Sequence, residues 1–121
     1  MLKTNSMKEK IIEILQDDPL YSILQDTPLE ETLYTDPYLT DIIEKKFYST
    51  PEVASWFGIT DAQLRYYIKP FEHYIFDDMT GNPSTATVIR LNLPSILKLR
   101  MILLLKDEYC VKGLKRILGI D

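Results

Sequence analysis

Residue types that build catalytic, redox and metal sites are scarce in this chain. Among 121 residues there are one cysteine, one histidine and four glycines. A single thiol cannot close an internal disulfide, and a lone imidazole without a cysteine pair gives no zinc-binding spacing. Four scattered glycines leave no material for a phosphate-cradling loop, and no nucleophile–base pair stands out. We therefore expect a protein that is not an enzyme and that uses no metal or cofactor.

Long apolar runs are missing as well. The longest, Met101 to Leu105, is far shorter than the ~20 residues that cross a bilayer. Residues 1–10 are polar and charged and lack the apolar stretch of a signal peptide. Cys110, the single thiol, is expected to be buried rather than reactive. These absences predict a cytoplasmic, reducing location and no membrane partner.

A basic excess is lacking over the whole chain, whose net charge is −4. The charge is uneven, because residues 1–46 hold five lysines and ten acidic residues, whereas residues 47–121 hold nine basic and eight acidic residues. Surfaces that bind nucleic acid usually show a clear basic excess. Any affinity for DNA must therefore come from where the charges sit. The uneven charge predicts an acidic segment, residues 1–46, followed by a second unit, residues 47–121.

The N-terminal segment, residues 1–46, is expected to be a helical arm. Ser6 and Glu9 read as a capping box for an amphipathic helix over about 6–16. Three pairs, Asp18-Pro19, Thr27-Pro28 and Asp36-Pro37, then recur nine residues apart, and each is followed by apolar residues. A polar residue before proline suits the start of a helix, so three short helices are expected. Two roles remain open for this arm: docking on the rest of the chain, or binding a protein partner or a second copy.

Residues 50–70 predict two helices joined by a tight turn. Thr50-Pro51-Glu52 is a helix start, and Gly58 suits the left-handed residue that ends a helix. Thr60 and Gln63 form a second capping box, and Pro70 ends the helix that follows. A helix, a glycine turn and a second helix in this length are typical of a helix-turn-helix. The residues expected to face the core are Val53, Ala54, Trp56, Phe57, Ile59 and Leu64.

The remaining residues predict a β-hairpin and two further helices. Two β-prone runs, 74–76 and 87–91, flank a Gly/Asn/Pro/Ser turn and indicate a hairpin, which after a helix-turn-helix is a wing. Pro94 begins a helix that is expected to reach about Asp107, and a last helix is expected over about 111–118. The fold class is therefore mainly α: a winged helix-turn-helix with a small β-hairpin wing and an N-terminal helical arm. In the last helix, Val111, Leu114, Ile117 and Leu118 are expected to face inward, and Lys112, Lys115 and Arg116 outward.

Residues of about 47–119 resemble the mercury-resistance regulator (MerR) family of winged-helix transcription factors. The resemblance is carried by Tyr48-Ser49-Thr50-Pro51-Glu52-Val53-Ala54, Phe57-Gly58-Ile59-Thr60 and Leu64-Arg65-Tyr66-Tyr67. It implies that the helix Thr60–Lys69 enters the major groove of DNA. It also implies that Arg65 and Tyr67 contact the backbone and base edges, and that Arg90 serves the wing.

The chemistry of the same residues agrees with this implication. Gln63 suits adenine, Arg65 suits guanine or phosphate, and the hydroxyls of Tyr66 and Tyr67 suit phosphate oxygens. The cationic residues of the last helix would either add phosphate contacts or form an ordinary solvated face. The candidate DNA-binding residues are Thr60, Gln63, Arg65, Tyr66, Tyr67, Lys69, Arg90, Lys112, Lys115 and Arg116.

Two functions follow as hypotheses. The first is a sequence-specific DNA-binding protein, a small transcriptional regulator of bacterial, plasmid or phage type. It would bind double-stranded DNA as a homodimer, with residues 1–46 as a candidate dimer contact, and would be nucleoid-associated in the cytoplasm. The alternative is a protein-interaction module, or a DNA-architectural or recombination accessory protein, on a winged-helix scaffold. Asp77-Asp78 and the overall acidity favour the interaction module, whereas Arg65, Tyr67, Lys69 and Arg90 favour DNA binding.

Overall fold

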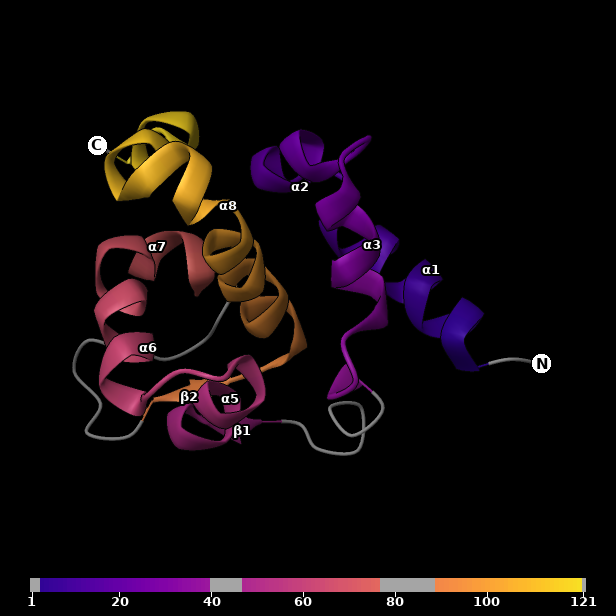
Figure 1. The fold of residues 1–121 in the computed structure, drawn as a ribbon, viewed down its shortest axis with the longest axis horizontal. Helices are drawn as coiled ribbons and strands as arrows, with labels where there is room; N and C mark the ends of the chain where they lie inside the picture. Colours follow the sequence, from indigo (N-terminus) through magenta and orange to yellow (C-terminus); the bar gives the residue numbers. More distant parts are fainter. Residues whose placement is uncertain (1–2, 40–46, 77–88, 121) are drawn as a thin grey trace.

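The computed structural model describes residues 3–39, 47–76 and 89–120, with side chains from Met7 onward. Within these ranges the fold is mainly helical, with one two-stranded antiparallel sheet (Figure 1). This confirms the expected mainly α class. In chain order the elements are α1 (Lys3–Leu15), α2 (Pro19–Leu24), α3 (Pro28–Thr35), β1 (Tyr48–Ser49), α5 (Thr50–Phe57), α6 (Asp61–Ile68), the 3-10 turn η1 (Lys69–Phe71), α7 (Glu72–Ile75), β2 (Arg90–Leu91) and α8 (Leu93–Leu118).

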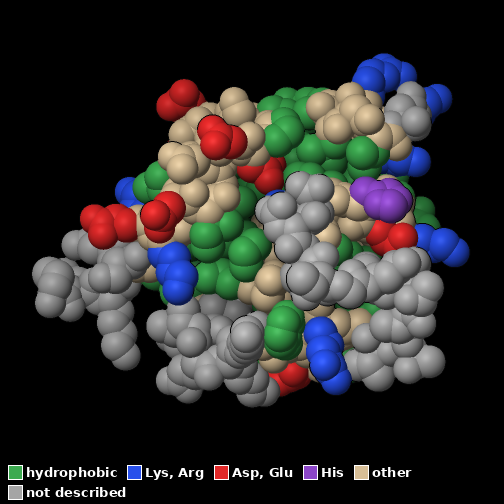
Figure 2. Space-filling model, turned by 180° about the vertical axis from the view of Figure 1, so that it is seen from behind, with side chains coloured by type: hydrophobic (Ala, Val, Ile, Leu, Met, Phe, Trp, Pro, Cys, Tyr) green, Lys and Arg blue, Asp and Glu red, His purple; other side chains and the backbone are tan. Residues whose placement is uncertain are grey.

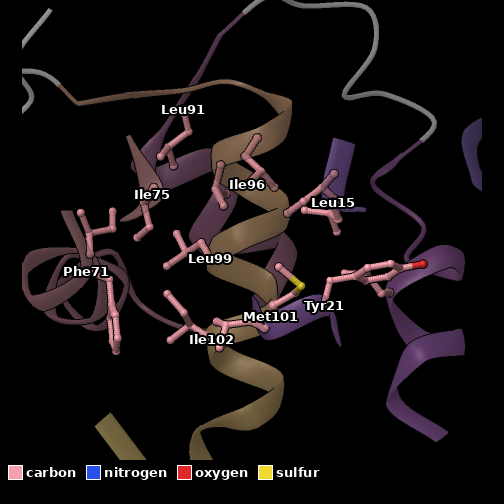
Figure 3. Close-up of a cluster of buried hydrophobic side chains, with 14 of the residues drawn as sticks. Leu15, Tyr21, Phe71, Ile75, Leu91, Ile96, Leu99, Met101 and Ile102 are labelled. Carbon is pink, nitrogen blue, oxygen red and sulfur yellow. The ribbon is translucent and has the colours of Figure 1, made fainter. Parts of the chain in front are cut away.

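Helix α8 is the centre of the core. Figure 1 shows α1, α2 and α3 on one side of it and α6 and α7 on the other. In the close-up of Figure 3, Leu99 and Ile102 of α8 point toward Phe71, whereas Met101 lies on the other side of the helix, beside Tyr21. These three side chains of α8 and Phe71 of η1 are fully buried. Both sides of α8 therefore belong to one continuous apolar core.

The N-terminal segment docks on α8 through its proline-started helices. Asp18 caps α2, its carboxylate accepting the Leu20 backbone N–H at 2.9 Å, and Pro19 is the first helical residue. Thr27 and Pro28 begin α3 in the same way, although Thr27 makes no side-chain cap bond. Leu20, Leu24 and Leu33 are fully buried. The third expected helix, after Pro37, is described only as far as residue 39. Helix α1 begins at Lys3, so Ser6 is a helical residue and not the expected N-cap.

Two capping boxes define α5 and α6. Ser49 caps α5, one residue before the expected Thr50, and Glu52 closes the box by accepting the Ser49 backbone N–H at 3.0 Å. Gly58 ends α5 with a φ of 73°, a left-handed value that suits glycine because it has no Cβ. Thr60 and Gln63 form the expected second box. The turn between the two helices was thus predicted correctly from local residues.

The expected hairpin is wrong in its first strand. Tyr74 and Ile75 lie in α7, not in a strand, and β2 pairs with β1 in the register Tyr48 to Leu91 and Ser49 to Arg90. The reason is tertiary: the side chains of Ser95 and Lys98 on α8 donate to the backbone oxygens of Ile75 and Tyr74, at 3.0 and 3.1 Å. Both carbonyls thus accept hydrogen bonds from α8 instead of from a neighbouring strand, and these tertiary contacts outweigh the β propensity of the segment. The expected turn, residues 77–84, and the start of the second expected run, residues 87 and 88, lie outside the described residues.

Helix α8 contains a break at Cys110. This residue has φ 55° and ψ 170°, so α8 consists of two helices that meet there. This agrees with the two separate helices expected from the sequence, one ending near Asp107 and one beginning near residue 111. A left-handed φ at a residue with a side chain is a strained conformation. Cys110 is exposed rather than buried, which corrects the expectation for it. Leu114 is fully buried as expected, but Ile117 is 36% exposed, because at 3.6 residues per turn it lies at the edge of the face that Leu114 and Leu118 share.

Candidate nucleic-acid interface

Helix α6 offers its polar face to solvent. Leu64 and Ile68 are buried against the core, whereas Ala62, Gln63, Arg65 and Tyr66 are exposed. The N-terminal segment, so far as it is described, lies on the opposite side of α8 and does not cover this face (Figure 1). The helix that was predicted from the sequence to contact DNA is therefore accessible to solvent.

An ion pair orders the guanidinium of Arg65. Its Nε donates to Oδ2 of Asp61 at 2.9 Å, one turn earlier on the same helix, and the two side chains are 46% and 39% exposed. The other oxygen, Oδ1, is shielded and has no hydrogen-bond partner of normal geometry among the described residues. The Thr50 hydroxyl is nonetheless the main reason that the pKa of the Asp61 carboxyl lies below its ordinary value, and Arg65 is the second reason. Asp61 is thus a fixed negative charge beside Arg65.

Thr60 and Gln63 are engaged with each other. The Thr60 backbone N–H donates to Gln63 Oε1 at 2.9 Å, and the Gln63 backbone N–H donates to Thr60 Oγ1 at 3.0 Å. Reading adenine with both ends of the carboxamide needs that oxygen as an acceptor. Both residues therefore act first as the cap of α6, and a contact of Gln63 to a base would compete with the capping box.

Two tyrosines and a lysine meet beside the end of α6. Tyr66 is 67% exposed, and its ring lies edge-on to that of Tyr67 with centroids 5.2 Å apart. Lys106 of α8 lies over the Tyr67 ring, 5.9 Å from its centroid, and also pairs with Asp107 at 3.1 Å. The sequence reasoning missed Lys106, because no local signal places a residue of α8 beside α6.

The other candidate residues lie farther along the molecule. Lys69 is exposed at the end of α6. Arg90 is exposed on β2, whose partner in the sheet, Ser49, is the N-cap of α5. Lys112 and Arg116 are exposed and Lys115 is half-buried, all beyond the break at Cys110. In the described ranges no hydrogen bond, ion pair or ring contact joins these three to α6.

Charge is sorted across the molecule. Residues 89–120 carry seven basic and two acidic residues, whereas residues 3–39 carry three basic and eight acidic ones. Seen from behind in Figure 2, most acidic side chains in view lie on the side of α1 to α3, and most basic ones lie toward the opposite edge. Among the basic residues of α8, Lys106 lies beside α6, whereas Arg100 and Lys98 lie at the contact with the N-terminal segment.

A cavity of about 430 Å³ lies where the α1–α2 turn meets α7 and α8. Its polar groups largely bind one another: the Tyr74 hydroxyl donates to both carboxylate oxygens of Asp18, at 2.8 and 2.9 Å, and Lys98 donates to the Tyr74 backbone oxygen. Burial, together with Asp18, raises the pKa of Tyr74 far above its ordinary value. The hydrogen bonds around this cavity connect the N-terminal segment to α7 and α8.

Comparison of the chain with models of known protein families, with curated proteins and with solved structures gives no match. Among the described residues, no helix is long and apolar enough to cross a membrane, and no cluster of three or more potential metal ligands is present.

Proposed function

We propose that this protein is a sequence-specific DNA-binding regulator that contacts duplex DNA through α6. In this proposal α5, the Gly58 turn and α6 act as a helix-turn-helix, α6 enters the major groove, and the sheet of β1 and β2 occupies the place of a wing. We also propose that the protein is a MerR-like regulator and that it is associated with the nucleoid. The proposal also includes assembly as a homodimer, since one small module of this size binds DNA weakly.

The observation that carries the proposal is the accessible face of α6. It combines a cation held in a defined orientation, Arg65, with the exposed hydroxyl of Tyr66 and the exposed ammonium of Lys69. Cationic and hydroxyl groups on one helix face are the groups that bind phosphate oxygens and base edges. The ion pair with Asp61 engages Nε of Arg65, so that within the described residues its two terminal nitrogens stay available for a contact with DNA.

Salt dependence of DNA affinity tests this proposal. For random-sequence duplex DNA, we expect the logarithm of the binding constant to fall linearly with the logarithm of the salt concentration, because bound cations displace counterions from phosphates. Lys69→Ala is expected to reduce the slope by about 1, as one phosphate contact is lost. The measurement is a fluorescence-anisotropy titration at several salt concentrations.

The matched control is Lys10→Ala. Lys10 is an exposed lysine of α1, on the far side of α8, so this variant removes the same charge without touching α6. We expect it to leave the slope unchanged. Equal slopes for all three proteins, or an absence of binding at low salt, would contradict the proposal.

A second candidate function is a protein-interaction module. The acidic surface of α1 to α3 favours it, since the exposed carboxylates of Glu9, Glu13, Asp17, Asp26 and Glu31 suit a basic partner. Partner binding that depends on α1 to α3 and survives Arg65→Ala together with Lys69→Ala would support this alternative.

A further inference from the structure

We infer that Asp61 is a positioning residue that presents the two terminal nitrogens of Arg65 to a guanine in the major groove. The inference rests on the proposed function and adds a base preference to it. It assigns to α6 a target chemistry, the O6 and N7 acceptors of guanine, and it names the residue pair that selects this base.

The geometry of the guanidinium is the first step. Arginine has five N–H donors in a rigid planar fork. Here the Nε–H is bound to Asp61 Oδ2 at 2.9 Å, and within the described chain the terminal nitrogens Nη1 and Nη2 have no partner. The bound Nε fixes the plane of the fork while its outer end stays free. A free pair of parallel donors matches the two acceptors on the major-groove edge of guanine.

The anchoring of Asp61 is the second step. It is the first residue of α6, where a negative charge is favourable beside the helix N-terminus. Its Oδ1 is enclosed by the protein, while its Oδ2 holds the Nε–H of Arg65. The carboxylate is therefore restricted in position at the start of α6, and it in turn orients the guanidinium of Arg65 one turn later. This ordering reduces the side-chain entropy that Arg65 loses when it binds.

The sign of the Asp61 charge provides a signature for the test. A carboxylate beside the groove repels phosphate, so Asp61 lowers the affinity for DNA of any sequence while it orders Arg65. Removal of the carboxylate is therefore expected to raise affinity for random-sequence duplexes and to lower the preference for guanine. A residue that only stabilises the fold would not change these two quantities in opposite directions.

The experiment begins with selection of bound fragments from a pool of random-sequence duplexes by the wild-type protein. Each G·C pair of the enriched site is then changed to A·T, and the ratio of the two dissociation constants is measured. We expect one position at which the wild type prefers guanine by about tenfold or more, and expect Asp61→Ala to lose most of this ratio. Asp61→Asn, which keeps an acceptor oxygen, is expected to retain more of it than Asp61→Ala.

Two controls separate the roles of charge and geometry. Arg65→Lys keeps the charge but lacks the fork, so it is expected to lose the guanine preference while the salt slope is maintained. Lys69→Ala is expected to weaken binding to all duplexes equally. Circular dichroism of each variant verifies that α6 remains folded.

The outcomes distinguish this inference from the function on which it rests. DNA binding with an unchanged guanine ratio in folded Asp61→Ala and Asp61→Asn would overturn the positioning role and leave the proposed function standing. No enrichment of any duplex by the wild type would overturn the proposed function and this inference with it.

Discussion

Leu24→Ala is expected to lower the free energy of unfolding by about 2–5 kcal/mol, the usual effect of emptying a leucine site in a packed core. Leu24 is fully buried in α2, and α2 packs on α8. Small domains unfold with about 5–15 kcal/mol in total, so this variant is expected to lose a large share of its stability. The measurement is urea unfolding followed by far-ultraviolet circular dichroism and by the fluorescence of Trp56.

The two probes also test whether the N-terminal segment folds with the rest. Trp56, the single tryptophan, lies in α5 and stacks on Tyr38 with centroids 5.3 Å apart. Because the core is continuous across α8, we expect both signals to shift together in Leu24→Ala. Ile12→Ala is the control, since Ile12 is 36% exposed on α1 and is expected to change stability far less. Loss of the dichroism of α1 to α3 with unchanged fluorescence would show that the segment unfolds separately.

Asp36→Ala is expected to destabilise the protein by about 3–5 kcal/mol, because it leaves a largely buried cation without its partner. Arg100 Nε and Nη2 donate to the two oxygens of Asp36 at 3.0 and 3.3 Å, and the side chains are 19% and 9% exposed. Asp36 also accepts the Tyr38 hydroxyl at 3.1 Å. The measurement is the free energy of unfolding in urea.

A second variant isolates the ion pair. Asp36→Ala combined with Arg100→Met removes both charges and is expected to be more stable than Asp36→Ala alone, since the unpaired guanidinium is gone. If the double variant is as unstable as the sum of the two single variants, the pair is not coupled, and the fastening of residues 36–39 to α8 has another cause.

Local chemistry explains which elements were predictable. The Thr60–Gln63 box, the Gly58 turn and the proline starts of α2 and α3 depend on residues within a few positions of one another, and the structure has all of them. The strand expected at 74–76 was wrong because the decisive contacts come from Ser95 and Lys98, on a different helix. Pattern alone does not contain such contacts.

The candidate site divides in the same way. Exposure of Arg65 and Tyr66 and burial of Leu64 follow from helical periodicity, so the polar face of α6 was predictable. The pairing of Asp61 with Arg65 is also local, since an acidic and a basic residue four positions apart lie on one helix face, and this spacing could have indicated it. Lys106 was not predictable as a neighbour of Tyr67, because α8 reaches α6 only through the packing of the core.

The most direct test of the central proposal is the map of backbone amide shifts in nuclear magnetic resonance spectra when duplex DNA is added to the protein. We predict that the largest changes fall on α6, Asp61–Ile68, and on its neighbours Lys69 and Lys106, with little change in α1 to α3. Changes confined to α1, α2 and α3, or spectra that are indifferent to DNA at low salt, would contradict the account.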